Sequence, residues 1–543
     1  MALLEVDNLT VTIGTARILK GVSLSLDAGE VLSIVGESGS GKSMTALSIM
    51  RLLPDRAVTA GRVALAGEDL LGLREAEMCE RRGRALGMVF QEPMSALNPV
   101  QTIGRQVAET VLAHRRVTRR EADAMAREAL DHVGLPAARF PLGRYPHELS
   151  GGQRQRVVIA MAMILKPKVL IADEPTTALD VTTQARILDL LRRLMRDDGV
   201  SLILISHDLP MVAQMADRIA IMKDGEIVET GETVGLFRNM RHPYSRMLSM
   251  ASTYRPRRIG RLRPDEGHGA PILLVKNIDR DYRLPRRSPF QPPRYLRAVD
   301  DVGFAIRRGE NVGLVGESGS GKSTLARVVL ALDVPRRGDV ILDGADFLAA
   351  RGRNLFALRR HIQAVFQDPY GSFDPRRSVA GLVAEPLHLD ETRPDAAERR
   401  RRVAEALVAV GLKPEDGEKY PHEFSGGERQ RLAIARALIT RPSLIVLDEA
   451  VSALDVSIRA QILDLLADLA ERFSVSYLFI SHDLTVVRAI TDRVVVMKDG
   501  RIVEQGDTER VFAEPRHPYT AALIAAMPDL ERTLAARAAA AAT

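Results

Sequence analysis

The chain has little that could build a covalent or membrane-embedded framework. Its 543 residues include a single cysteine, Cys79, which excludes a disulfide framework and a cysteine-built metal cluster. No apolar run approaches the roughly 20 residues that cross a bilayer. The longest runs, such as 200–205 and 444–447, are typical of buried parallel strands. Glu5 and Asp7 stand where a signal peptide needs apolar residues, so we expect a cytosolic protein.

The composition indicates a globular protein with more than one domain. Hydrophobic residues make up 46% and charged residues 27%, which argues against general disorder, and 543 residues are too many for one core. The net charge of +6 suggests nucleic acid or a membrane surface as a partner, but many arginines stand beside acids, as at 399–402 after Glu398. Such clusters are typical of solvated helix faces, so we expect no nucleic-acid partner.

An internal repeat sets the domain organisation. GESGSGKS, SGG-x-RQR, SHDL and RHPY each occur twice, and the last three pairs share an offset of 275 residues (425 − 150, 481 − 206 and 516 − 241). A period this long indicates duplicated domains, because solenoid repeats run only about 20 to 50 residues. We expect a first domain at 1–251, an Arg/Pro/Gly-rich linker at 252–271, a second domain at 272–530 and a frayed Ala-rich helical tail at 531–543.

Short apolar runs alternate with helical and polar stretches in each copy. They lie at 31–35, 169–172 and 201–205, and again at 312–315, 444–447 and 477–480. The second copy also has a Pro/Arg-rich insertion around 285–294. The alternation predicts an α/β fold with a mostly parallel sheet in each domain.

A glycine-rich sequence, G-x-x-x-x-G-K-[ST], follows the first apolar run of each copy. Its glycines let backbone N–H groups surround an anion, its lysine reaches the β- and γ-phosphate oxygens, and its hydroxyl can bind Mg²⁺. Both copies place the motif between a predicted strand and a predicted helix. We therefore expect two nucleoside triphosphate sites. Their residues would be Gly36, Glu37, Ser38, Gly39, Ser40, Gly41, Lys42 and Ser43, and Gly316, Glu317, Ser318, Gly319, Ser320, Gly321, Lys322, Ser323 and Thr324.

An acidic pair ends a later apolar run in each copy, Asp173-Glu174 and Asp448-Glu449. An aspartate there can hold Mg²⁺ through water, and the adjacent glutamate can take a proton from attacking water. A lone pair of this kind is more often a solvated strand end. The loop lysine upstream and an apolar strand ending in histidine downstream favour a hydrolytic site.

Ser-Gly-Gly before a basic helical run is the most specific feature. LSGGQRQR begins at Leu149 and FSGGERQR at Phe424. Each sequence places a serine hydroxyl and two glycines, which have no side chains, at a helix N-terminus. The unpaired backbone N–H groups there favour binding of an anion. A domain has no use for two γ-phosphate sites of its own, so we infer that each segment serves the nucleotide of the other domain.

Together these residues resemble the ABC transporter ATPase family, and the resemblance covers nearly the whole chain twice. It implies two P-loop NTPase domains of ABC type in tandem, each with a mostly parallel sheet core, an antiparallel β subdomain and a helical subdomain. In the family, two domains pack antiparallel and each ATP lies between one P-loop and the partner's Ser-Gly-Gly. Fusion implies an intramolecular domain dimer.

The resemblance also implies a role for each matched residue. The catalytic set would be the bases Glu174 and Glu449, the switch histidines His207 and His482, and the Q-loop glutamines Gln91 and Gln367. Mg²⁺ would be held by Ser43, Ser323, Gln91, Gln367, Asp173 and Asp448. The opposite nucleotide would be touched by Ser150, Gly151, Gly152, Gln153, Ser425, Gly426, Gly427 and Glu428, and by the D-loop residues Asp180 and Asp455.

Narrower features resemble the dipeptide, oligopeptide and nickel importer branch. They are QEPMSALNP and QDPYGSFDP after the Q-loops, and RHPYS and RHPYT near the domain ends. They imply a peripheral ATPase on the cytoplasmic face of the inner membrane, which energises import of a di- or oligopeptide or a peptide-like compound. Its partners would be two transmembrane permease subunits and, indirectly, an external solute-binding protein. Glutathione, opines and nickel stay open as cargo.

Two other classes contain tandem ABC domains. Those that act on ribosomes carry a long charged helical linker, whereas 252–271 is short. DNA-repair members need zinc cysteines, which Cys79 alone cannot supply. The long segments before Ser150 and Ser425 instead match the helical subdomain that docks on permeases.

The halves differ at the position where the family stacks an aromatic on adenine. Tyr282 occupies it in the second half and Ile13 in the first, and isoleucine cannot stack on a purine. Glu428 also replaces the usual signature glutamine. In the family arrangement, the site of Lys42 would combine Ile13 with FSGGE, and the site of Lys322 would combine Tyr282 with LSGGQ.

We predict weaker nucleotide binding at the site that contains Lys42. Loss of stacking costs about 0.5 to 1.5 kcal/mol, by analogy with aromatic pairs. The variants Lys42→Ala and Lys322→Ala each leave one intact site, so nucleotide titration should give Lys322→Ala the weaker residual affinity. Equal residual affinities would contradict the asymmetry.

Overall fold

The computed structural model describes residues 2–91, 96–177, 179–252, 270–284, 292–368, 371–452 and 454–541. The predicted linker and the insertion around 285–294 therefore lie largely outside the described residues. The rest forms two compact units. One consists of the described residues of 2–252, 455–457 and 528–541, and the other of the described residues of 270–454 and 458–527. Within these ranges no helix combines the length and the apolar character that a membrane span needs.

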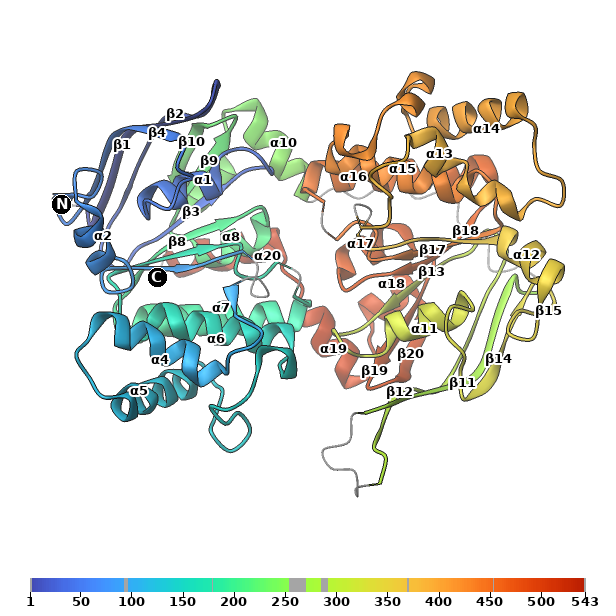
Figure 1. Ribbon diagram of the computed structural model, residues 1–543, viewed down its shortest axis with the longest axis horizontal. Helices are drawn as coiled ribbons and strands as arrows, with labels where there is room; N and C mark the ends of the chain where they lie inside the picture. Colours follow the sequence, from blue (N-terminus) through green and yellow to red (C-terminus); the bar gives the residue numbers. More distant parts are fainter. Residues whose placement is uncertain are drawn as a thin grey trace. The chain divides into compact units, whose positions relative to one another are not determined.

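The first unit contains two sheets (Figure 1). A four-stranded sheet has the order β2-β1-β4-β5, and a six-stranded sheet has the order β10-β9-β3-β8-β7-β6, parallel except for β10. Their strands are β1 (Leu4–Ile13), β2 (Ala16–Leu26), β3 (Val31–Val35), β4 (Ala57–Leu65), β5 (Glu68–Asp69), β6 (Leu86–Val89), β7 (Val169–Asp173), β8 (Ser201–Ser206), β9 (Arg218–Lys223) and β10 (Glu226–Glu232).

The helices of the first unit connect these strands. They are α1 (Lys42–Ile49), α2 (Glu75–Arg81), α4 (Ile103–His114), α5 (Arg119–His132), α6 (Gly151–Met163), α7 (Val181–Asp198), α8 (Leu209–Met215), α9 (Thr233–Arg238), α10 (Pro243–Ser252) and the last helix of the chain, α20 (Leu530–Ala541). Helices α4 to α7 form a helical layer on one side of the unit (Figure 1).

The core of the first unit is layered because the parallel strands alternate their side chains between two faces. On β3, Leu32 and Ile34 pack with the antiparallel sheet and α1. Val31 and Val35 on the opposite face pack in the cluster that holds the helices α4 to α8. The six-stranded sheet is therefore buried on both faces, which explains its continuous apolar strands.

The second unit repeats this topology, with the sheet orders β12-β11-β14-β15 and β16-β17-β18-β13-β19-β20. Its strands are β11 (Leu273–Arg283), β12 (Tyr295–Ile306), β13 (Asn311–Val315), β14 (Arg337–Leu342), β15 (Ala345–Asp346), β16 (Ile362–Val365), β17 (Leu444–Asp448), β18 (Ser476–Ile480), β19 (Arg493–Lys498) and β20 (Arg501–Asp507). Its helices are α11 (Lys322–Val329), α12 (Gly352–His361), α13 (Val379–Val383), α14 (Ala396–Ala409), α15 (Gly426–Leu438), α16 (Val456–Phe473), α17 (Leu484–Ile490), α18 (Thr508–Ala513) and α19 (Pro518–Ala525).

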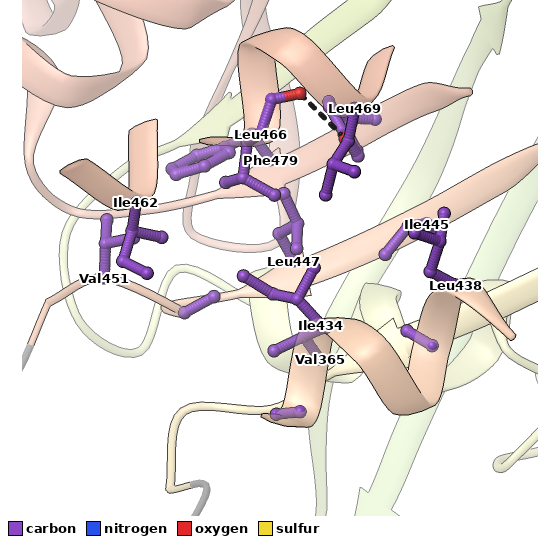
Figure 2. Close-up of a cluster of buried hydrophobic side chains, with 14 of the residues drawn as sticks. Val365, Ile434, Leu438, Ile445, Leu447, Val451, Ile462, Leu466, Leu469 and Phe479 are labelled. Atoms are coloured by element: carbon purple, nitrogen blue, oxygen red, sulfur yellow. Dashed lines mark hydrogen bonds between the residues drawn. The ribbon is translucent and has the colours of Figure 1, made fainter. Parts of the chain in front are cut away.

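A buried apolar cluster fixes the strand that ends at Asp448. Figure 2 shows Ile434 of α15, Leu466 of α16 and Leu447 of β17 within it. The hydroxyl of buried Tyr477 donates to the Leu466 carbonyl at 2.9 Å.

Both units have the predicted α/β fold, each with a mostly parallel sheet, an antiparallel sheet and helices.

The Ala-rich end of the chain is an anchored helix rather than a frayed one. Helix α20 belongs to the first unit, where the Arg537 guanidinium donates to the carbonyls of Ala213 (2.9 Å) and Ala216 (2.5 Å). Carbonyls at a helix end lack intrahelical partners, so a guanidinium there satisfies them. The sequence analysis did not predict this contact because an alanine-rich helix gives no indication of what it packs against.

Candidate nucleotide site in each unit

The carboxyl edge of the six-stranded sheet gathers the predicted residues in each unit. Parallel strands end at the same edge, so segments far apart in sequence become neighbours there. In the first unit, β3, β8, β7 and β6 lead in that order to the loop 36–43, His207, Asp173-Glu174 and Gln91. In the second unit, β13, β18, β17 and β16 lead to 316–323, His482, Asp448-Glu449 and Gln367.

Glycine sets the shape of the phosphate-binding loop at two positions. A Cβ atom on Gly36 would lie 2.2 Å from the Met222 carbonyl oxygen of β9, and Gly41 has φ of 106° where α1 begins. Only glycine adopts that φ readily. Because Gly41 has no side chain to cap the helix, the first N–H groups of α1 are left for an anion. Gly316 and Gly321 repeat both features.

The loop lysine is buried and donates to its own loop. Lys42 Nζ donates to the carbonyls of Gly36 (2.8 Å) and Glu37 (2.7 Å), and Lys322 makes the same two bonds in the second unit. Burial lowers the pKa of Lys42, although Glu174 opposes that shift. The ammonium of each lysine is thus held by carbonyl oxygens of its own loop.

An aspartate oxygen beside the loop suits a divalent cation. Oδ1 of Asp173 and Oδ1 of Asp448 are buried and have no hydrogen-bond partner in the described part of the chain. The Ser43 side chain lies near Asp173. Burial raises the pKa of Asp173, and burial together with Glu449 raises the pKa of Asp448 to about 6. A cation bound there would satisfy the oxygen and its charge, so these residues fit the predicted Mg²⁺ site.

Each glutamate after the aspartate has a strained backbone. Glu174 has φ of 46° and Glu449 has φ of 51°. Their N–H groups donate to the carbonyls of Ile205 and Ile480, both at 2.9 Å, which holds the turn in place. This conformation costs about 1 to 2 kcal/mol outside glycine, and such outliers concentrate at functional sites.

Three side chains hold the Glu174 carboxylate. An ionised carboxylate only accepts hydrogen bonds, so His207 Nδ1 donates to Oε1 at 3.0 Å, while Gln91 Nε2 and Thr177 Oγ1 donate to Oε2 at 3.0 and 2.9 Å. Burial opposes ionisation, but the bonds from His207 and Thr177 outweigh it and lower the pKa of Glu174 to about 2. The sequence analysis did not identify Thr177 as a site residue. The signal that could have indicated it is its position three residues after Glu174.

Among the described residues of the second unit, fewer of these contacts hold the glutamate. His482 Nδ1 donates to Glu449 Oε1 at 3.2 Å and, despite burial, lowers the pKa of Glu449. Ser452, at the place of Thr177, donates to the Glu449 backbone carbonyl at 2.9 Å. Gln367 is exposed two residues after β16.

The signature serines cap the helices that follow them. Ser150 accepts from the Gln153 N–H, and the Gln153 side chain accepts from the Ser150 N–H at 3.0 Å. Ser425 and Glu428 form the same capping box, with one addition: the Ser425 hydroxyl also donates to Glu428 Oε2 at 2.8 Å. These bonds from Ser425 lower the pKa of Glu428, so a negative charge stands beside that hydroxyl.

The two signature glycines serve different purposes. A Cβ atom on Gly427 would lie 2.6 Å from Ile458 Cγ2 of α16, whereas one on Gly426 would meet nothing within 4 Å. In the first unit, Gly152 has the same relation to Thr183 of α7, at 2.3 Å. The second glycine is therefore required by helix packing within the unit, a reason the sequence did not reveal.

The D-loop aspartates stand at the start of the helices α7 and α16. Asp180 caps α7, where it accepts from the Thr183 N–H at 2.9 Å and the Thr182 hydroxyl at 2.8 Å. Asp455 directly precedes α16. Ala178 and Ala453, which open the two ALD sequences, lie outside the described residues, as do parts of both segments after the Q-loops.

The predicted adenine-stacking positions differ in their surroundings. Tyr282, near the end of β11, donates its hydroxyl to Asp333 at 2.8 Å, and the Arg280 guanidinium lies 4.6 Å from the ring centroid. Ile13 ends β1 and packs against the apolar core. Tyr282 is thus held by a hydrogen bond at its hydroxyl and by a cation against one face of its ring.

Comparison with known proteins finds two family models, each matching twice. The model described as "ABC transporter" matches residues 19–177 and 299–452, and "Oligopeptide/dipeptide transporter, C-terminal region" matches 228–273 and 503–542. Curated relatives named "Glutathione import ATP-binding protein" occur in Salmonella choleraesuis (strain SC-B67) and Escherichia coli (strain K12). Both are 46% identical over 94% of this chain, which covers 86% and 87% of their respective lengths.

Gly427→Ala should destabilise the second unit, while Gly426→Ala should not. The added methyl meets Ile458, whose branched side chain is stiff in a helix, so we expect a loss of about 1 to 3 kcal/mol. Thermal or chaotrope unfolding of the full chain measures the difference. The explanation fails if the two variants are equally stable.

Proposed function

The chain belongs to the ABC transporter ATPase family, and on that premise we propose that it energises import of glutathione or a closely similar peptide. The supporting observation is the 46% identity, over 94% of the chain, to ATPases named for glutathione import. The oligopeptide/dipeptide transporter C-terminal region, present in both halves, points to the same branch. Among the cargoes that the sequence leaves open, these relatives favour glutathione over longer peptides, opines and nickel.

Each unit would bind ATP through its loop and the first turn of the following helix. Lys42 or Lys322 would transfer its ammonium from the loop carbonyls to the β- and γ-phosphates. Mg²⁺, when bound, would neutralise the charge that develops between these phosphates. Ser43 with Asp173, and in the second unit the matching serine and aspartate (Ser323 and Asp448), would hold it.

Glu174 and Glu449 would be the general bases. A carboxylate whose pKa is about 2 is ionised at neutral pH but is a weak base. In the first unit, Gln91 and His207 hold that carboxylate, and both are predicted to face Mg²⁺ or the γ-phosphate once ATP is bound. We propose that ATP draws both donors away and thereby raises the basicity of Glu174 only when substrate is present.

The second half of each site would come from the other unit. The N-terminus of α6, capped by Ser150, and that of α15, capped by Ser425, would each cover the γ-phosphate bound by the opposite loop. Neither unit could then hydrolyse ATP alone. Closure around two ATP molecules would move the helical layers and change the access of the attached permeases.

Glu428 would weaken one of these two sites. Its ionised carboxylate holds the Ser425 hydroxyl, so a bound γ-phosphate would face an added negative charge. In the first unit, the neutral Gln153 side chain occupies that place. The site that pairs Lys42 with Ser425 would therefore bind ATP less tightly, in the same direction as the loss of stacking at Ile13.

The proposed partners are two membrane-embedded permease subunits, which would place this chain on the cytoplasmic face of the inner membrane. Cargo recognition would lie in the permeases and in an external solute-binding protein. The segments between β6 and α6, and between β16 and α15, contain the helices α4, α5, α13 and α14 and would supply the docking surface.

The double variant Glu174→Gln with Glu449→Gln should bind ATP but not hydrolyse it, since glutamine cannot accept the proton of the attacking water. Nucleotide titration should be near the wild-type value, while phosphate release should fall by about a hundredfold or more. The matched control is the variant Glu68→Gln on β5, which alters the ion pair between Glu68 and Arg81 of α2. Unchanged hydrolysis in the double variant would remove both glutamates from the mechanism.

Glutathione should stimulate ATP hydrolysis in the assembled transporter. The chain is reconstituted with its permease subunits and solute-binding protein in proteoliposomes, and hydrolysis is measured with glutathione, a dipeptide, an oligopeptide or Ni²⁺ as cargo. We expect the largest stimulation with glutathione and none in the Glu174→Gln/Glu449→Gln variant. Stimulation by another cargo, with none by glutathione, would overturn the assignment.

A further inference from the structure

The RHPY sequence opens a helix close to the end of each half. Pro243 and Pro518 are the first residues of α10 and α19, where proline is favoured because the first helical N–H needs no partner. The histidine before each proline accepts, through Nδ1, from the N–H of the tyrosine that follows, at 3.2 Å for Tyr244 and 3.1 Å for Tyr519. The turn thus fixes the direction in which the tyrosine leaves the helix.

A glutamate on the edge strand anchors this turn to the sheet. Glu229 of β10 accepts from the N–H groups of Arg241 (2.7 Å) and His242 (3.2 Å). Glu504 of β20 makes the equivalent pair of bonds, at 2.8 and 3.1 Å. The RHPY turn is therefore held firmly to the six-stranded sheet.

From this anchored position the tyrosine reaches the phosphate-binding loop of its own unit. The Glu37 N–H donates to the Tyr244 hydroxyl at 3.0 Å, and the Glu317 N–H donates to the Tyr519 hydroxyl at 2.9 Å. Both rings are buried, and a lysine of the adjacent strand lies 5.2 Å from the Tyr244 ring centroid and 5.0 Å from that of Tyr519. Burial raises the pKa of Tyr244 to about 12, so its hydroxyl keeps its proton.

The same loop residue is also held by the loop lysine. The Glu37 carbonyl accepts from Lys42 while its N–H donates to Tyr244, and Glu317 is held in the same way. A buried tyrosine that only filled space could satisfy its hydroxyl with any nearby carbonyl. Here, in two halves that differ in much of their sequence, it accepts from one particular loop N–H.

We propose that Tyr244 and Tyr519 are positioning residues for ATP: each fixes the start of its phosphate-binding loop, so that the loop keeps its shape when the lysine turns to the phosphates. The proposal rests on the assignment of these loops as ATP sites. It gives the oligopeptide-type C-terminal region, which contains both tyrosines, a part in nucleotide binding. The tyrosines act through the loop and do not touch the nucleotide.

The test removes the hydroxyl and keeps the ring. Tyr519→Phe is made in a Lys42→Ala background, and Tyr244→Phe in a Lys322→Ala background, so that each measurement reports one site of the full chain. Without its acceptor the part-buried loop N–H loses this hydrogen bond, so we expect the Kd for ATP with Mg²⁺ to rise about fivefold or more.

Tyr477→Phe in the Lys42→Ala background is the matched control. It removes the buried hydroxyl that donates to Leu466, in the same unit but away from the loop. It should lower the Tm without changing the affinity for ATP, whereas Tyr519→Phe should reduce the gain in Tm that ATP produces. The proposal is wrong if Tyr519→Phe leaves the affinity unchanged, or if both variants change it equally.

A different variant tests the proposed function itself. If Lys42→Ala combined with Lys322→Ala still binds ATP as tightly as the wild type, the loops are not the ATP sites. If that double variant loses binding while both Tyr→Phe variants retain the affinity of their backgrounds, only the positioning role is overturned.

Discussion

In each unit the proposed nucleotide site depends on one constraint, the close passage of the loop backbone beside a strand, which is β9 in the first unit and β19 in the second. Gly36 lies so close to the Met222 carbonyl that no side chain fits, and the Ser40 carbonyl accepts from Gly225 at 2.9 Å in the turn after β9. These contacts fix where the loop can run, and hence where Lys42 and the start of α1 lie. Because the loop is shaped by the protein itself, little ordering remains for the nucleotide to induce.

The order of the parallel strands places the other predicted site residues beside that loop. With β8 beside β3 and β7 beside β8, His207 and Glu174 arrive at one edge from segments more than thirty residues apart, and their side chains meet at 3.0 Å. The strained backbone at Glu174 is held by a hydrogen bond to β8, so the direction of the Glu174 carboxylate depends on the sheet. The same strand order therefore determines both the fold and the position of the site residues in each unit.

Much of the fold and of the candidate site could be predicted because short stretches of the sequence indicate it. The apolar runs, the two phosphate-binding loops and the acidic pairs gave the fold class and the positions of Lys42 and Glu174, since strand, glycine turn and helix each leave a short-range signature. Contacts between distant segments left no such signal. The second signature glycine is needed because Ile458 approaches it, and Tyr244 matters because of Glu37, more than 200 residues away. The anchoring of the Ala-rich end through Arg537 was missed for the same reason.

The central claim is that each unit binds one ATP and covers the other's, and a structure of the full chain tests it most directly. The Glu174→Gln/Glu449→Gln variant is saturated with ATP and Mg²⁺, and its structure is determined by cryo-electron microscopy. We predict that the γ-phosphate held by Lys42 lies within hydrogen-bond distance of Ser425, and the one held by Lys322 within that distance of Ser150. Two bound nucleotides with both serines turned away from the phosphates would contradict the claim.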